Sequence, residues 1–454
     1  MNTSTASKNY TSAFVSLTFL FFMWGFMTVL NDILIPYLKQ AFDLTHTKAM
    51  LVQFAFFTSY FVGSLIYFFI SATKGDPINK IGYKKGIIIG LIISGIGALL
   101  FFPAAQFQMY GFFLSALFVM GLGFTMLQIA ANPYVAILGP QKSASSRLNL
   151  AQGFNSLGTT IAPVLGGYLI FTFFKDSAGS DAVKIPYLIF AFIFFLMAIA
   201  IKFTPLPRFT NPDEVAPGFG ALGYRQLIFG MIAIFMYVGG EVSIGSMLIS
   251  YLKLPEIGGL DDAQASVFVA IYWGGQMIGR FLGAVSLSST NKSMKYLIMI
   301  SISAIAFVII GLTTNFDSAL IYLIFLGINL IGFFIGNSMP QRTLYIFALI
   351  NIIFLGIALT NTGETALWTI IGIGLFNSIM WSNIFTLAIS GLGKYTSQGS
   401  SLLVMMILGG ALLPLLMGVI ADNYGVHMSF IVPVISYIYI AFYGISGYKP
   451  KKIN

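Results

Sequence analysis

The chain is a succession of apolar runs, most of about 20 residues, separated by short polar joints. A helix of about 20 residues crosses the roughly 30 Å hydrocarbon core of a bilayer. Of the 454 residues, 57% are hydrophobic and only 8% are charged, which is too few polar groups to cover a water-soluble surface. The pattern therefore predicts an all-α polytopic membrane protein.

The apolar runs fall into two groups around one polar joint, residues 204–224, which is rich in proline and glycine and resembles a linker. We expect an N-terminal bundle over 1–203, a cytoplasmic linker over 204–224 and a C-terminal bundle over 225–454. The predicted spans are 13–38, 49–72, 86–106, 109–138, 147–174, 185–203, 225–252, 263–288, 294–314, 318–337, 342–361, 364–392, 398–421 and 427–447.

The basic residues orient these spans. With the N-terminus inside, 18 of the 23 lysines and arginines fall on the cytoplasmic side, with Arg280 counted among them. This asymmetry follows the positive-inside rule and predicts that both termini are cytoplasmic. It also explains the net charge of +9 as a signal for orientation and attraction to anionic lipid, without a nucleic-acid partner.

Two of the 14 acidic residues, Asp32 and Glu241, lie well inside predicted spans. Each is in the first span of its half, which indicates an internal duplication. A carboxylate in the bilayer core costs about 2.5–3.5 kcal/mol on insertion scales, so both must face other helices or a cavity. We interpret them as ion-coupling sites, with Asp32 the stronger candidate. The alternative is an acid that pairs with neighbouring polar side chains.

Amide side chains also gather in a few spans. Asn31 precedes Asp32, Gln128 and Asn132 share the fourth span, and Asn377 lies in the span 364–392. Gln152 and Asn155 are three residues apart and lie on one helix face. These amides either bind a polar substrate or hold helices together.

An aromatic residue accompanies these amides. Trp24 lies eight residues before Asp32, on nearly the same face, where its ring could stack on a sugar. The alternative is packing in the core or at the membrane interface.

Several of these runs resemble the glucose/galactose transporters of the fucose–proton symporter family, in the major facilitator superfamily. They are FFMWGFMTVLNDILIPYL, MLQIAANPYVAILGP, SSRLNLAQGFNSLGTTIAPVLGG, YVGGEVSIGSMLISYL, GLFNSIM and GLGKYTSQGSSLLVMMILGGALLPLLMGVIAD. The resemblance implies 12 helices in two bundles around a central cavity, alternating access, and symport of a hexose with a cation. By motif, Asp32 is the coupling acid, Glu241 is the acid of the glucose/galactose branch, and Trp24, Gln152 and Asn155 contact sugar.

The sequence departs from the family pattern in three places. Gln128 replaces an acid of the fucose-transporting members, so sodium is a serious alternative to a proton as the coupling cation. Trp381, Ser382 and Asn383 replace Phe-Pro-Thr after GLFNSIM. The spans 294–314 and 318–337 have no counterpart, so we expect an inserted helix pair within 294–337 and 14 helices in all.

Other function classes fit less well. The two histidines lie at span ends, there is no cysteine, and no nucleophile or phosphate-binding motif is present, so we expect neither an enzyme nor an organic cofactor. An exporter of drugs or other metabolites on the same fold is the alternative function, although its cavity should be lined mainly by apolar side chains. We expect a monomer in a bacterial inner membrane, with a sugar and the bilayer as its partners.

Overall fold

The computed structural model describes residues 11–44, 48, 51–168, 183–207 and 218–450. Within these ranges the regular structure is helical, and helices or consecutive helices occupy all the predicted spans. Eleven of the described helices are long and apolar enough to cross a membrane. This confirms the all-α polytopic prediction.

The N-terminal half, residues 11–207, contains six long helical passages. They are α1 (Thr11–Ala41), α3 (Leu51–Lys74), α5 (Tyr83–Leu99) with its continuation α6 (Phe101–Gln106), α7 (Tyr110–Ile137), α8 (Ala144–Tyr168) and α9 (Lys184–Phe203). The short helix α4 (Pro77–Ile81) and the 3₁₀ turn η1 (Gln141–Ser143) lie in two of the joints.

The C-terminal half, residues 218–450, begins with the 3₁₀ turn η4 (Gly220–Gly223). Its first passages are α10 (Arg225–Leu252), α11 (Asp262–Ser286), α12 (Lys292–Thr313), α13 (Phe316–Gly336) and α14 (Pro340–Thr360). The last three are α15 (Gly363–Asn377) with α16 (Met380–Ala388), then α17 (Thr396–Met405) with α18 (Gly409–Tyr424), and finally α19 (Val426–Ser429) with α20 (Ile431–Phe442). The turns η5 (Gly393–Tyr395), η6 (Met406–Leu408) and η7 (Tyr443–Gly447) join or end these helices.

Two predicted spans are interrupted in the structure. The run 364–392 breaks between α15 and α16, and the run 398–421 breaks at η6 between α17 and α18. At the second break, a Cβ on Gly409 would collide with the main chain of Phe235 on α10. Glycine there lets α18 approach α10 more closely than a side chain would allow.

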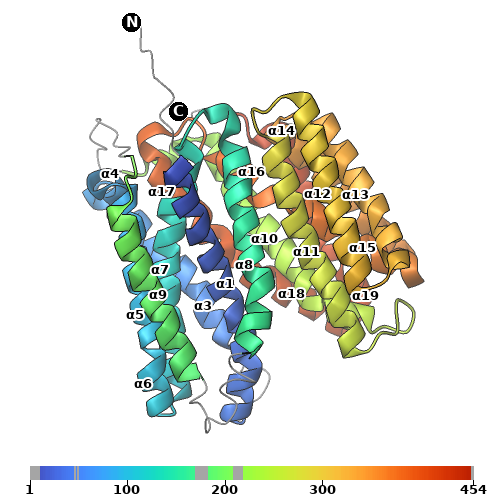
Figure 1. Cartoon of the computed structure of the whole chain (residues 1–454), viewed down its shortest axis with the longest axis horizontal. Coiled ribbons are helices and arrows are strands. Elements are labelled where there is room, and N and C mark those ends of the chain that lie inside the picture. Colours follow the sequence, from blue (N-terminus) through green and yellow to red (C-terminus); the bar gives the residue numbers. More distant parts are fainter. Residues whose placement is uncertain (1–10, 45–47, 49–50, 169–182, 208–217, 451–454) are drawn as a thin grey trace, which may run out of the picture.

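The two halves repeat the same packing. In the N-terminal half α1 packs on α8, α3 on α7, and α5 on α9, while in the C-terminal half α10 packs on α18, α11 on α15, and α14 on α20. Helices α12 and α13 have no counterpart in this repeated packing, and they lie beside α11 and α14 at one edge of the molecule (Figure 1). Lys295 at the start of α12 donates to Ser286 O at 2.9 Å and Ser338 Oγ at 2.8 Å. The division into two bundles and the inserted nature of this pair stay predictions.

The halves are joined near the end that carries α4, η1 and η5, which we call the basic end because Lys74, Lys80, Lys84, Lys85, Lys142 and Lys394 lie there (Figure 1). Asn79 Nδ2 donates to Lys394 O at 2.8 Å, and Ser397 Oγ lies 3.3 Å from Tyr83 OH. Nearer the middle, Ser145 Oγ is 2.6 Å from Thr386 Oγ1. The described hydrogen bonds between the halves reach as far as Thr160 on α8, and none is described nearer the opposite, far end.

A buried carboxylate stabilises the α3–α4 joint at the basic end. Asp76 is 1% exposed, accepts from Tyr67 OH at 2.6 Å, and caps α4 by accepting from Ile78 N at 2.9 Å. Burial raises the pKa of the Asp76 carboxyl, and the hydrogen bond from Tyr67 opposes this rise. The Tyr67 hydroxyl therefore offsets part of the cost of burying a charge.

We predict that Tyr67→Phe lowers the thermal unfolding midpoint in detergent, by an amount equivalent to about 1–3 kcal/mol, because Asp76 loses a donor that water cannot replace. Tyr296→Phe is the matched control, since Tyr296 is 38% exposed and its hydroxyl has no described bond to a carboxylate. Equal midpoints for the two variants would show that the Tyr67 hydroxyl does not stabilise this joint.

Candidate functional site

Close packing of α1 on α8 brings the first group of predicted site residues together. A Cβ on Gly25 would collide with Asn155, and one on Gly158 would collide with the Phe22 main chain, so both glycines are required for this approach. Asn155 Nδ2 donates to Phe21 O at 2.9 Å. This bond supports the helix-holding interpretation of Asn155. Asn31 and Asp32 also lie on α1, but their side chains are outside the described part of the chain.

Trp24 and Gln128 meet at Tyr60, a residue that the sequence analysis did not single out. The Tyr60 hydroxyl on α3 lies beside the side chains of Trp24 and Thr28 on α1 and Gln128 on α7. Side chains from three helices therefore meet at one phenol. Tyr60 is 2% exposed and Trp24 is 8% exposed. No spacing within a single helix predicts this cluster, because it depends on how three helices are rotated against one another.

Two amides of α7 keep hydrogen-bonding capacity without a described partner. Gln128 Oε1 and both polar atoms of the Asn132 side chain are buried and unbonded within the described structure. Gln152 on α8 is 5% exposed, and no hydrogen bond of its side chain is described. Buried amides without partners are costly, so these groups are candidates to bind a polar ligand or water.

Glu241 on α10 is the carboxylate of a second cluster. Tyr237, one turn earlier, donates from its hydroxyl to Glu241 Oε1 at 2.5 Å, and Tyr272 OH on α11 is 3.4 Å from Glu241 O. The preceding Gly239 lies against Leu413 of α18, where a Cβ would not fit. Glu241 itself is partly exposed. The spacing of four residues between Tyr237 and Glu241 was the signal in the sequence for this pair.

Asn377 is the centre of a hydrogen-bonded network behind Glu241. Its Nδ2 donates to Tyr272 OH at 3.0 Å, and its Oδ1 accepts from Tyr437 OH at 2.6 Å and Asn351 Nδ2 at 3.0 Å. Asn377 is fully buried. Both ends of its amide are therefore used within the protein, which supports a role in positioning Tyr272 beside Glu241.

The structure corrects the placement of Arg280. The prediction placed it among the charges of the cytoplasmic side, but it lies six residues before the end of α11 and is only 9% exposed. Its guanidinium donates to Gln152 O at 3.4 Å and to the Ser156 hydroxyl on α8, and to Ser378 O at 3.3 Å. Arg280 thus bridges the two halves, and its charge acts electrostatically on Glu241. A positive charge so far inside a span was the signal that could have identified it.

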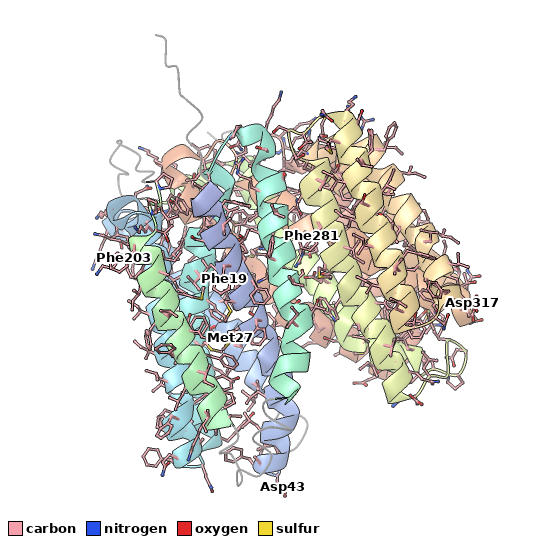
Figure 2. All side chains as sticks on the ribbon, in the orientation of Figure 1. Phe19, Met27, Asp43, Phe203, Phe281 and Asp317 are labelled. Atoms are coloured by element: carbon pink, nitrogen blue, oxygen red, sulfur yellow. The ribbon has the colours of Figure 1, made fainter. Side chains whose placement is uncertain are left out.

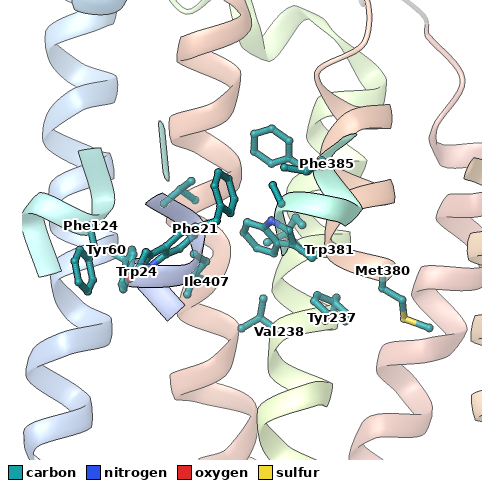
Figure 3. Packing of buried hydrophobic residues seen from close by; sticks show 14 of the residues in the cluster. Phe21, Trp24, Tyr60, Phe124, Tyr237, Val238, Met380, Trp381, Phe385 and Ile407 are labelled. Carbon is teal, nitrogen blue, oxygen red and sulfur yellow. The ribbon is translucent and has the colours of Figure 1, made fainter. Parts of the chain in front are cut away.

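Aromatic side chains of the two halves face each other near these clusters. In Figure 3, Trp24, Tyr60 and Phe124 lie on one side of the view, and Tyr237, Met380 and Trp381 lie on the other, with Phe21 and Ile407 between them. Trp381 Nε1 is buried and has no described partner. The site therefore combines rings suited to stacking with unpaired donors and acceptors.

The described residues contain no group of three or more histidine, cysteine, aspartate or glutamate side chains that could hold a metal ion. The chemistry that the described site offers is hydrogen bonding, ring stacking and the charges of Glu241 and Arg280. Such an arrangement suits the binding of a small polar molecule.

Comparison with known proteins places the chain in a family. Residues 15–346 match the model of the Major Facilitator Superfamily. A glucose/galactose transporter of Brucella abortus biovar 1 (strain 9-941) is 44% identical over 99% of this chain and 97% of its own length. The L-fucose-proton symporter of Escherichia coli (strain K12) is 32% identical over 92% of this chain and 89% of its own.

Solved structures agree. The crystal structure of the E. coli fucose:proton symporter in the outward conformation matches with a TM-score of 0.75 and 29% identity, over 96% of this chain and 99% of that one. An outward-facing bacterial homologue of the iron transporter ferroportin shares the fold alone, at 12% identity and a TM-score of 0.66. The relatives are transporters, which confirms the expectation of a non-enzymatic protein. The chain belongs to the major facilitator superfamily, in the family of the glucose/galactose transporters and fucose–proton symporters.

Proposed function

We propose that the protein carries a hexose, with glucose, galactose and fucose as the candidates, into the cell by symport with a cation and alternating access. The observation that carries this proposal is the pair of facing clusters, Trp24–Tyr60–Gln128 and Tyr237–Glu241, with unpaired amide atoms nearby. The names of the full-length relatives support a sugar as the cargo. The membrane is a bacterial inner membrane, and the basic end, with both termini, faces the cytoplasm.

A sugar suits this site better than an amphipathic drug does. Each hexose hydroxyl left unpaired in a dry site costs about 1–3 kcal/mol, so a sugar site needs many donors and acceptors. Gln128, Asn132 and Trp381 offer buried polar atoms without described partners, and Trp24 offers a ring for stacking. An exporter of apolar compounds would not need these groups, and that alternative is not favoured.

The direct test of this function is uptake of radiolabelled glucose, galactose and fucose into proteoliposomes. With an inward cation gradient and an inside-negative potential, the protein should accumulate at least one of these sugars. Export of a dye or drug without any hexose uptake would support the alternative function.

The arrangement of the halves supports an outward-facing state. The described bonds between the halves gather toward the basic end, and the helices diverge toward the far end (Figure 1). In this state a hexose enters from the far end. Inward release then requires that the bonds of Asn79, Ser145 and Arg280 to the other half break.

We propose different roles for the two amides of α8. Gln152 contacts substrate, because its side chain has no described bond, whereas Asn155 fixes α8 to α1 through Phe21 O. Gln152→Ala should weaken hexose affinity by roughly tenfold or more, the equivalent of one lost hydrogen bond. Isothermal titration with glucose and galactose measures this effect, and Gln141→Ala, at an exposed position of η1, is the control.

Asn155→Ala should instead lower the thermal midpoint, because Phe21 O loses its donor, while the remaining folded protein keeps most of its affinity. If Gln152→Ala bound both sugars normally, Gln152 would be a structural amide and the substrate contacts would have to lie elsewhere.

Coupling is assigned to Asp32, with Glu241 in support. One charge moving inward at about 100 mV supplies roughly 2.3 kcal/mol, and a tenfold ion gradient adds about 1.4 kcal/mol. A single coupled proton or sodium ion, with no organic cofactor, is therefore sufficient for accumulation. Glu241 accepts a hydrogen bond from the Tyr237 hydroxyl and lies near the charge of Arg280, which suits it to a supporting role in binding.

We predict that Asp32→Asn abolishes accumulation of hexose against a gradient but retains exchange of labelled for unlabelled hexose at equal concentrations. The variant carries a neutral group where the cation would neutralise the carboxylate, so the carrier can reorient without the cation. Asp43→Asn, an exposed acid beyond the end of α1 (Figure 2), is the control and should accumulate normally. Accumulation by Asp32→Asn vesicles would reassign coupling, with Glu241→Gln the next variant to test.

The domain boundaries remain part of this proposal. The N-terminal bundle over 1–203 and the C-terminal bundle over 225–454 move against each other, and the linker 204–224 connects them. Helices α12 and α13, within the inserted segment 294–337, lie at the edge of the C-terminal bundle, away from the facing clusters of the site (Figure 1). They therefore do not line the path of the sugar. We also propose that the protein functions as a monomer.

A further inference from the structure

A groove lies at the basic end of the N-terminal half, away from the site described above. It has a volume of about 790 Å³ and is lined by the end of α4, the start of α5, the end of α9 and the residues that follow α9. Both α5 and α9 lie at one edge of the molecule (Figure 1), where Figure 2 labels Phe203 of α9. The groove is therefore accessible from the surrounding membrane.

One part of the groove is strongly basic. Lys84, Lys85 and Lys202 line it, and none of the lining residues is acidic. Lys84 Nζ donates to Thr204 O at 2.8 Å, whereas Lys85 and Lys202 are exposed. Two ammonium groups are therefore available for an anion at the same place.

Backbone donors add to these charges. Helix α5 begins at Tyr83, and its N-cap residue, Gly82, provides no side chain to cap it. The first N–H groups of a helix have no partners within the helix, and the helix dipole favours an anion there. Gly82 and Tyr83 both line the groove, so the start of α5 and the lysines act on one location.

The remaining walls of the groove are apolar and continue into two exposed stripes. Ile88, Ile92, Phe195 and Ile199 line the groove. On α5 the stripe contains Ile89, Ile92 and Ile96, which are 39–44% exposed, and on α9 it contains Phe192, Leu196, Ile199 and Phe203, which are 52–77% exposed. Both stripes follow helical spacing and run from the lysines toward the membrane interior.

We propose that this groove binds one anionic phospholipid of the cytoplasmic leaflet. The phosphate lies between Lys85, Lys202 and the first N–H groups of α5, and an acyl chain follows the apolar stripes of α5 and α9. A phospholipid has the chemistry that this groove combines, an anionic head directly attached to long apolar chains. A soluble phosphate ester would use only the basic part. The proposal is independent of the cargo in the central site.

Native mass spectrometry of the detergent-purified full chain tests this proposal with phosphatidylglycerol and phosphatidylcholine of the same acyl chains. The protein should retain one phosphatidylglycerol in preference to phosphatidylcholine. The variant Lys85→Gln/Lys202→Gln should bind it roughly thirtyfold more weakly, because each lysine near the membrane surface contributes about fivefold to the affinity for an anionic lipid. The variant Lys142→Gln/Lys292→Gln removes the same charge from exposed positions outside the groove and should bind normally.

Four outcomes decide the proposal. Equal weakening in both double variants would show a general electrostatic attraction and overturn the groove as a site. Equal retention of the two lipids by the unaltered protein would also overturn it. Displacement of the lipid by excess glycerol 3-phosphate would overturn a lipid in favour of a soluble phosphate ester. Recovery of binding in Lys85→Arg/Lys202→Arg would support the proposal and show that the glutamine variant had lost charge and not its fold.

Discussion

The hydrogen bonds that join the two halves near the basic end fix the orientation of one half relative to the other. An apolar environment offers no water to replace a broken bond, so a buried polar group that loses its partner is costly. Ser145 with Thr386, Asn149 with Asn383, and Arg280 with Ser156 provide such partners across the boundary between the halves. Because these bonds cross the boundary, the orientation of the halves and the polar contacts of α8 depend on one another.

This dependence connects the candidate site to the movement proposed for transport. Arg280 donates to α8 and to Ser378, and its charge also acts on Glu241, so it is shared by the boundary and the site. The main-chain carbonyl of Gln152 accepts from Arg280, and its side-chain amide is the group to which we assign substrate contact. A bound hexose at Gln152 would therefore change the surroundings of a residue that joins the halves. In the proposed transport cycle, binding and reorientation are coupled because the bonds between the halves exist in this state and must break in the other.

The sequence predicted the positions of the helices well because burial in lipid imposes long apolar runs, whatever their packing. It also identified Glu241 correctly as an acid inside a span, and the family resemblance that was inferred from the motifs is confirmed by the full-length relatives. The contacts were less predictable. Tyr60 lies beside Trp24 and Gln128 only because α1, α3 and α7 are rotated toward one another. Arg280 was misplaced because proximity to a span end does not reveal that the helix is packed there against α8.

The most direct test uses the absence of native cysteine to place pairs of spin labels at each end and measure their separations. One pair, Lys142→Cys with Lys292→Cys, reports on the basic end, and the other, Asp43→Cys with Glu256→Cys, reports on the far end; all four positions are exposed. Adding hexose with the coupling cation should populate longer distances at the basic end and shorter distances at the far end. Distances that stay unchanged at both ends, or change in the same direction, would contradict alternating access between these two halves.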